Sequence, residues 1–339
     1  MIIRVVQDLT QRRKGAKAQR GRPSFFATLC LCVFAFLPVP AQDQAEQIVR
    51  AQELLRQSRE AIGNAQAWEQ LQTVSASGRV RRPMKYVSVQ SPEKVEEKEK
   101  VLSGKIKVDF ALPDRYRCRI TNATLSGFSY SSVEVVNGDR AWRTPPPPII
   151  SSFHDSRVID VGDVERSREK YAQDARQQIA LYTLGWLLQT PGSLPAEFIY
   201  AGPVETEGRK LEAIVVKGPE GFAPLLLLDR ETKIPFAIVM SFVEVKRVPV
   251  FVEVASLSRQ FIHETYARAR RERESRRRLP QRREIQWRFS DHQPVSGLLL
   301  PHRITTIIDG EVLDELTINE FRVNQPINQK KFEGSPEVK

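Results

Sequence analysis

The sequence predicts a mainly β fold with α-helices: a single curved antiparallel sheet of about ten or eleven strands, with two helices laid across one side. Many short segments alternate apolar and polar residues, as strands with one buried face do. Two longer segments have helical spacing, one before the strands and one in their middle. The order helix, strands, helix, strands is the one expected of a sheet that helices cover on one side.

The first helix is predicted to begin at Asp43, which forms a capping box with Glu46. From Ile48 to Ile62 apolar residues recur at intervals of three and four, and Gly63 ends the pattern. This spacing predicts one amphipathic helix with one buried stripe.

Strands follow the first helix. Residues 74–80 alternate apolar with polar side chains, and the charged stretch Ser91–Lys100 is predicted to be a flexible loop. Two strands then flank the turn Leu112-Pro113-Asp114, with apolar residues on one face and mainly charged residues on the other. The apolar set is Ile106, Val108, Phe110, Tyr116, Cys118 and Ile120.

A hairpin is predicted over residues 133–143, where an Asn137-Gly138 turn places Val133 opposite Trp142. The four prolines of Pro145–Pro148 end this part of the sheet, because proline cannot donate a hydrogen bond to a neighbouring strand.

The second helix is predicted at about Val164–Gln189, with acidic residues in its first turn. Its second half, Ile179–Leu188, is apolar nearly all round, so we expect it to be buried on more than one side. Further strands are predicted at 198–201, 211–217, 225–229 and 234–245.

The clearest strands lie near the C-terminus. Ile285, Trp287 and Phe289 alternate with polar residues, and Leu298–Ile308 is rich in Leu, Ile and Thr. Asp309-Gly310 supplies the positive φ angles of a two-residue hairpin turn before one more strand.

The last strand changes phase. Leu316 and Ile318 share one face, whereas Phe321 and Val323 share the other, so the alternation slips at Asn319-Glu320. This slip predicts a β-bulge, and a bulge bends the strand that carries it.

The N-terminus predicts export. Seven Lys and Arg residues precede the apolar stretch Phe25–Leu37, and Val39-Pro40-Ala41 provides small residues for cleavage. This stretch of 13 residues falls short of the roughly 20 that span a membrane, which favours a cleaved signal peptide over an anchor. We therefore expect a signal peptide at 1–41, a periplasmic domain at 42–332 and a flexible tail at 333–339; a membrane-attached form stays an alternative.

An Arg-rich segment at about 258–284 interrupts the strands and is predicted to be an insertion. One interpretation is a solvated arm with weak ion pairs at helical spacing. The other is contact with an anionic surface such as lipid head groups. Export disfavours nucleic acid as the partner. The residues assigned to this contact are Arg268, Arg270, Arg271, Arg273, Arg276, Arg277 and Arg278.

The sequence contains no serine elbow, metal-binding helix, phosphate loop or pair of carboxylates typical of an enzyme, so we expect no enzymatic activity, metal or cofactor. The four histidines are scattered along the chain. Cys118, the one cysteine outside the signal peptide, is expected to be a small buried apolar residue.

One aromatic and aliphatic set is a candidate lining of a ligand cavity, although such residues more often fill a core. The set consists of Trp142, Tyr182, Trp186, Leu187, Trp287 and Phe289.

Four segments resemble the superfamily of the periplasmic lipoprotein carrier and its outer-membrane receptor, the LolA/LolB-like proteins, and are closest to uncharacterised exported relatives. They are VSASGRVR, KIKVDFALPDRYRCRI, LLLLDRETKIPF and LLLPHRITTIIDGEVLDELTINEFRVNQPI. The resemblance implies an open half-barrel whose concave face, closed by the two helices, holds acyl chains.

We therefore expect an exported, monomeric, non-enzymatic protein that binds a lipid or acyl chain, in envelope lipid or lipoprotein handling. The alternative is an envelope interaction or scaffold protein with a filled core, which binds an anionic partner or membrane surface through the Arg-rich arm.

Overall fold

The computed structural model describes residues 41–89, 95–123, 129–144, 161–244, 250–252 and 281–333, and the single residues 264, 267 and 271. Pro38–Lys339 forms one compact unit. Apart from Ala41, the predicted signal peptide lies outside the described residues, as does most of the Arg-rich insertion.

Thirteen strands form one sheet in the order β5-β4-β3-β2-β1-β13-β12-β11-β9-β8-β7-β6, with β10 beside β1. The strands are β1 Thr73–Val89, β2 Val95–Ala111, β3 Arg115–Ala123, β4 Ser129–Asn137, β5 Arg140–Thr144, β6 Glu197–Thr206, β7 Arg209–Lys217, β8 Leu225–Asp229, β9 Pro235–Glu244, β10 Val250–Val252, β11 Gln281–Val295, β12 Leu298–Ile308 and β13 Glu311–Val323. All neighbours along this order are antiparallel; β10 is parallel to β1. The prediction of one antiparallel sheet is confirmed, with more strands than expected.

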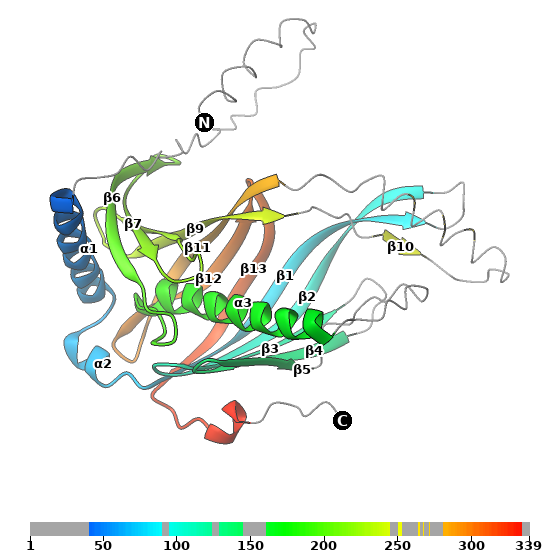
Figure 1. The fold of residues 1–339 in the computed structure, drawn as a ribbon, viewed down its shortest axis with the longest axis horizontal. Helices are drawn as coiled ribbons and strands as arrows, with labels where there is room; N and C mark the ends of the chain where they lie inside the picture. The colour runs from blue at the N-terminus through cyan, green and yellow to red at the C-terminus, as the bar shows by residue number, and fades with distance from the viewer. Residues whose placement is uncertain are drawn as a thin grey trace, which may run out of the picture. The chain divides into compact units, whose positions relative to one another are not determined.

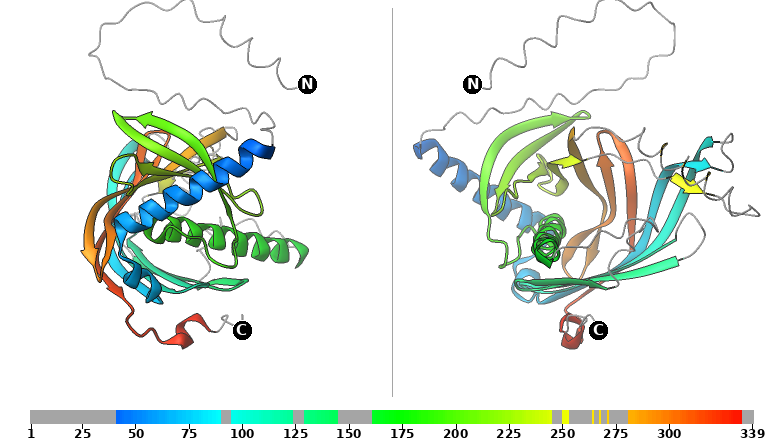
Figure 2. Two further views of the ribbon diagram at one scale, coloured as in Figure 1. Left: turned by 90° about the vertical axis from the view of Figure 1, so that its left-hand side faces the viewer. Right: turned by 45° about the vertical axis from the view of Figure 1, so that its right-hand side comes forward.

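Two long helices accompany the sheet, and Figures 1 and 2 show α3 crossing the inside of its curve. The helices are α1 Ala41–Ile62, the short α2 Ala65–Glu69, α3 Val161–Leu187 and the 3-10 turn η1 Gln329–Phe332. Residues of α1 and α3 belong to the same hydrophobic core as the strands. We call the sheet face turned toward α3 the inner face and the opposite face the outer face. Among the described residues, no helix is long and apolar enough to cross a membrane.

The predicted bulge is confirmed. Ser77 of β1 pairs with Glu320, but the next residue, Gly78, pairs with Ile318, so Asn319 is the extra residue. A Cβ atom on Gly78 would lie 2.1 Å from the Thr317 carbonyl oxygen, and only glycine fits there without a shift. Because of this extra residue, Leu316 and Ile318 before it and Phe321 and Val323 after it all face the core. Simple alternation would place the two pairs on opposite faces of the sheet.

Two local predictions are wrong. The charged residues Val95–Lys100 are not a loop but the first part of β2, which pairs with β1 along its full length; residues 91–94 are outside the described chain. In the β4–β5 hairpin, Trp142 lies opposite Val135 and not Val133. The reason is that Gly138-Asp139, rather than Asn137-Gly138, forms the two-residue turn.

The C-terminal segment covers part of the outer face. Phe332 of η1 is fully buried and packs with Ala111 and Val135 on β2 and β4. The side-chain amide of Asn137 donates to the Phe332 carbonyl at 3.1 Å. Both faces of this part of the sheet are therefore covered by apolar side chains.

Candidate ligand site beneath helix α3

Helix α3 spans the sheet and is attached near both edges. The Arg176 guanidinium donates to the Asp139 carbonyl in the β4–β5 turn at 2.9 Å, and the Gln173 amide donates to the Glu220 carbonyl between β7 and β8 at 3.4 Å. Beyond its C-terminal end, the Leu188 carbonyl accepts a hydrogen bond of 3.0 Å from Arg59 of α1. These bonds place the apolar second half of α3 over the inner face.

A glycine lets α3 lie close to the sheet. A Cβ atom on Gly185 would fall 2.1 Å from the Cζ atom of Phe289 on β11. The Phe289 ring therefore occupies the space that any side chain at position 185 would need, and it is 5% exposed. This contact fixes the height of α3 above β11.

Aromatic rings fill the space on the other side of α3. The Trp186 ring makes edge-on contacts with Phe110 of β2 at 5.5 Å and Phe321 of β13 at 5.2 Å between centroids. It also lies 5.5 Å from Tyr182, whose ring stacks on Tyr116 of β3 at 6.4 Å. Such tilted and edge-on pairs are the favourable arrangements for aromatic rings.

Trp186 carries an unpaired polar group into this cluster. Its side chain is 0% exposed, and no described residue accepts a hydrogen bond from its Nε1–H. A buried donor without an acceptor costs about 1–3 kcal/mol, so most buried indole N–H groups have a partner.

Three ionisable side chains lie in or beside this cluster, and burial acts on all of them. It raises the pKa of Cys118 to about 12 and raises the pKa values of Tyr116 and Tyr182 well above the ordinary phenol value. All three groups are therefore uncharged at neutral pH, and none is a nucleophile there.

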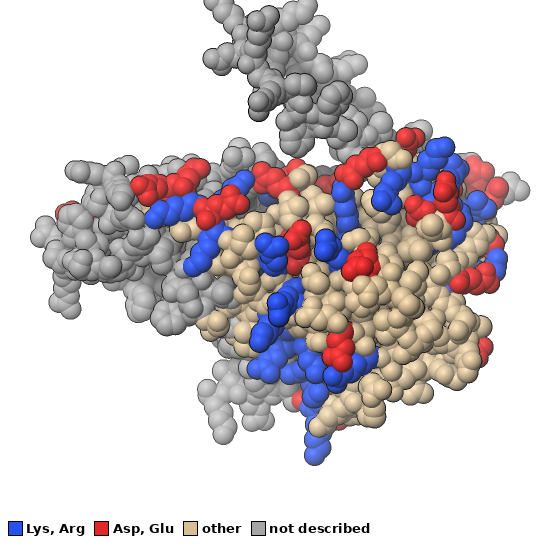
Figure 3. All heavy atoms as spheres, turned by 180° about the vertical axis from the view of Figure 1, so that it is seen from behind, with Lys and Arg blue, Asp and Glu red and all other residues tan. Residues whose placement is uncertain are grey.

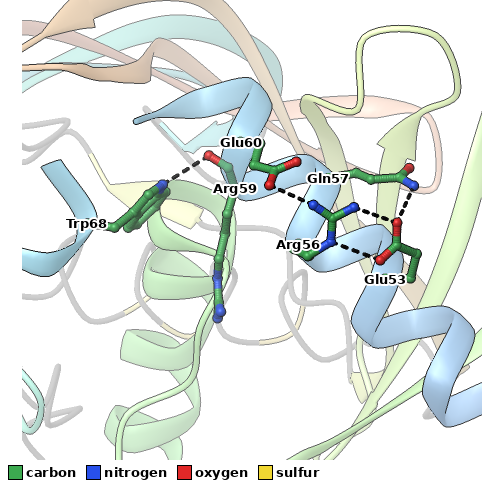
Figure 4. A network of polar contacts seen from close by, with 6 residues as sticks. All are labelled: Glu53, Arg56, Gln57, Arg59, Glu60 and Trp68. Atoms are coloured by element: carbon green, nitrogen blue, oxygen red, sulfur yellow. Dashed lines mark hydrogen bonds and ion pairs between the residues drawn. The ribbon is translucent and has the colours of Figure 1, made fainter. Parts of the chain in front are cut away.

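The solvent side of α1 carries a different kind of network (Figure 4). Arg56 bridges Glu53 and Glu60 with N–O distances of 2.7 and 2.6 Å, and its hydrogen bond holds the pKa of Glu53 at about 2. The Trp68 indole of α2 donates to the Arg59 carbonyl at 2.9 Å. This network lies on the surface of the helix and stabilises it.

A buried carboxylate lies on the inner face of β7. Glu212, 3% exposed, accepts hydrogen bonds from Tyr200 at 2.6 Å and Arg230 at 2.9 Å. Burial and the neighbouring Glu212 raise the pKa of Tyr200. Because the carboxylate has a cation and a hydroxyl as partners, a structural role accounts for it.

The predicted ligand residues fall into two groups. Tyr182, Trp186, Leu187, Trp287 and Phe289 all belong to the main core. Trp142 does not: it lies on the outer face with the C-terminal Phe332.

Sequence reasoning missed three aromatic members of the inner cluster, Phe110, Tyr116 and Phe321. Their alternation in the strands marks them as inward, but the sequence does not show that they meet α3. Of the predicted anionic-surface residues, Arg271 is described and exposed, and the other six lie outside the described chain.

Among the described residues, no three His, Cys, Asp or Glu side chains are placed to hold a metal ion. The His302 and Phe321 rings pack nearly perpendicular to each other, with 5.0 Å between centroids, and the Nδ1 atom of His302 lies 3.1 Å from the Leu300 carbonyl oxygen. Burial lowers the pKa of His292, which keeps that ring neutral at neutral pH.

No protein-family model matches the sequence, and no curated protein matches it at a significant level. The structure is similar to a LolA superfamily protein from Nitrosomonas europaea, at a TM-score of 0.40 and 13% identity over 84% of this chain and 97% of that chain. It is similar to a domain from Vibrio parahaemolyticus described as an outer membrane lipoprotein-sorting protein, at a TM-score of 0.39 and 8% identity over 84% and 97%. A DUF1329 family protein from Desulfovibrio piger has a TM-score of 0.31 and 8% identity over 84% and 97%.

Proposed function

We propose that this chain is an exported, non-enzymatic protein that binds an amphipathic, lipid-like ligand between α3 and the inner face of the sheet. The observation that carries the proposal is the Trp186 indole N–H, which is fully buried among apolar rings and has no acceptor among the described residues.

A lipid satisfies both properties of this position. Its ester carbonyl or carboxylate accepts a hydrogen bond from the indole, and its acyl chain contacts the surrounding rings. Each buried methylene contributes about 0.8 kcal/mol whichever apolar group receives it, so the acyl chain requires no specific motif. The neutral Tyr116 and Tyr182 hydroxyls lie beside the same rings and place no charge against an acyl chain.

Entry of a ligand requires α3 to move. The bonds from Gln173 and Arg176 that attach the helix near the sheet edges are exposed to solvent, and exposed hydrogen bonds contribute little net stability. The contact of Gly185 with Phe289 is buried and holds the C-terminal half. We therefore propose that the N-terminal half of α3 is the part that opens.

The test compares two Trp→Phe variants. Trp186→Phe keeps an aromatic ring but removes the N–H group, whereas Trp68→Phe removes an N–H whose acceptor, the Arg59 carbonyl, is known. A fluorescent fatty acid is titrated into each protein. We expect Trp186→Phe to bind about three- to tenfold more weakly, which corresponds to one neutral hydrogen bond, and Trp68→Phe to bind like the wild type.

Stability gives the complementary readout. We expect Trp186→Phe to be at least as stable as the wild type in urea, since it removes an unpaired donor, and Trp68→Phe to lose about 1 kcal/mol. Absence of fatty-acid uptake by the wild type, together with bare polypeptide mass in native mass spectrometry, would refute lipid binding.

A second candidate is an envelope interaction protein with a filled core. It is favoured by the packing of Trp186 against Phe110 and Phe321, which already gives these rings apolar neighbours on several sides. Under this proposal the Arg-rich arm binds an anionic partner. Deleting residues 264–280, which leaves all of β11 in place, then abolishes partner binding with an unchanged fold, whereas under the first proposal fatty-acid binding survives the deletion.

A further inference from the structure

Basic side chains gather on the outer face of the sheet, away from α3 (Figure 3). We call this set the outer basic face; it spans β12, β13, β1, β2 and β3, which are consecutive in the sheet. Its members are Arg79, Lys105, Lys107, Arg115, Arg117, Arg119, Arg303 and Arg322.

The strand register places like charges directly opposite one another. Lys107 of β2 lies opposite Arg119 of β3, and Arg79 of β1 lies opposite Lys105 of β2. All four side chains are exposed. Directly opposed like charges destabilise a sheet, so this arrangement does not help the fold. An anionic partner turns the repulsion into attraction.

Two carboxylates lie in the same rows, and each already faces a cation of the set. Asp109 is buried, with one oxygen 2.7 Å from the Ser75 hydroxyl and the other 3.6 Å from Arg117. Glu320 pairs with Arg322 at 2.8 Å. These two carboxylates do not neutralise the eight basic residues of the set, so the outer basic face keeps a net positive charge.

We propose that the outer basic face docks the protein on an anionic phospholipid surface. Neighbouring strands are about 4.8 Å apart, and every second residue along one strand is about 6.8 Å from the last. The cations therefore form a two-dimensional array and do not converge on one point. Such an array fits the many separate charges of a lipid surface better than a single bound anion. Each basic residue close to an anionic membrane strengthens binding about fivefold.

This surface is independent of the proposed ligand site, because its side chains alternate with those that face α3. Lys105 and Lys107 of β2 are exposed on the outer face, whereas the alternating residues Ile106 and Val108 belong to the main core. None of the residues of the outer basic face belongs to the Arg-rich insertion at about 258–284.

The experiment measures binding of the full chain to vesicles of phosphatidylglycerol mixed with phosphatidylcholine by co-sedimentation. Lys105→Glu/Lys107→Glu changes two exposed lysines of β2. The matched control, Lys210→Glu/Lys217→Glu, makes the same charge change at two exposed lysines of β7, near the other edge of the sheet. Circular dichroism verifies the fold, and Lys105→Ala/Lys107→Ala replaces the first variant if that variant does not fold.

We expect the wild type to bind the phosphatidylglycerol vesicles and not pure phosphatidylcholine. The β2 variant should bind about tenfold or more weakly, and the β7 control within about twofold of the wild type. Three results would overturn the proposal: no wild-type binding, equal loss in both variants, or unchanged binding of the β2 variant. Equal loss in both variants would mean that net charge alone determines binding. Unchanged binding of the β2 variant would mean that another segment binds the vesicles.

Discussion

The carboxylate of Asp114 accepts a hydrogen bond from the backbone amide of Ser193 at 2.8 Å, and this bond ties the turn between β2 and β3 to the segment that follows α3. The backbone carbonyl of Asp114 also accepts from Gly138 of the β4–β5 turn at 3.1 Å. The turn Leu112-Pro113-Asp114 therefore anchors both a hairpin and the end of a helix.

A second aspartate, Asp229 at the end of β8, holds the turn that contacts helix α1. Asp229 accepts hydrogen bonds from the Glu231 and Thr232 amides and from the Thr232 hydroxyl. Burial opposes its ionisation, but these bonds outweigh burial and lower the pKa of Asp229. The turn thus held presents the Lys233 carbonyl to the Ser58 hydroxyl of α1 at 2.6 Å. The turns at Asp114 and Asp229 therefore fasten the segment after α3, and helix α1, to the sheet.

The first prediction concerns the Asp114 anchor. Asp114→Ala leaves the Ser193 amide without its acceptor, and we expect a loss of about 1–2 kcal/mol in the free energy of unfolding. Urea unfolding followed by circular dichroism measures it. Asp174→Ala, at an exposed position of α3, is the matched control and should change stability by less than about 0.5 kcal/mol. Equal midpoints for the two variants would contradict the anchoring role.

The second prediction concerns the close approach of α3 to β11. Alanine is the better helix former, yet Gly185→Ala places a Cβ atom 2.1 Å from the Phe289 ring. We expect a net loss of about 1–3 kcal/mol from overpacking, which exceeds the gain in helix propensity. Thermal unfolding measures the loss. The double variant with Phe289→Leu should recover part of it, and strictly additive losses would show that the two residues do not compete for the same space.

Much of the architecture follows from local patterns. Alternation in β2 and β3 identified the inward residues from Ile106 to Cys118, and the phase slip in β13 located the bulge at Asn319. These predictions succeed because the side chains of a strand alternate between its faces, whatever the distant structure is.

What failed depends on distant parts of the chain. The aromatic set places Trp142 in the ligand site, but Trp142 lies opposite Val135 on the outer face, where the C-terminal Phe332 packs against the sheet. The charged start of β2 does not look like a strand; it is one because β1 supplies a partner along its whole length. No local pattern in either segment reveals such a partner.

The third prediction concerns the bulge. Deleting Asn319 removes the extra residue, so Leu316, Ile318, Phe321 and Val323 alternate in one phase and all four still face the core. We therefore expect the deletion variant to fold with the same register and to lose no more than about 2 kcal/mol in urea unfolding. Asn319→Ser keeps the residue count and should stay within about 1 kcal/mol of the wild type in urea. A deletion variant that fails to fold would show that Asn319 is not the extra residue of the strand.

The fourth prediction concerns the thiol of Cys118 and its pH dependence. Burial raises its pKa from 9.0 in the unfolded chain to about 12 in the fold, so the folded chain keeps its proton longer. The contribution of this group to stability is therefore present below pH 9.0 and is lost as the pH rises toward about 12.

In a Cys30→Ser/Cys32→Ser chain, we expect alkylation of native Cys118 by iodoacetamide at about pH 8 to be at least about a hundredfold slower than in urea, because the thiolate is the reacting form. The exposed position Ser103→Cys, in a chain whose native cysteines are all Ser, provides the fast reference. If native Cys118 reacted as fast as this reference, the inner face beneath α3 would have to be open to water, and the burial that raises its pKa would not exist.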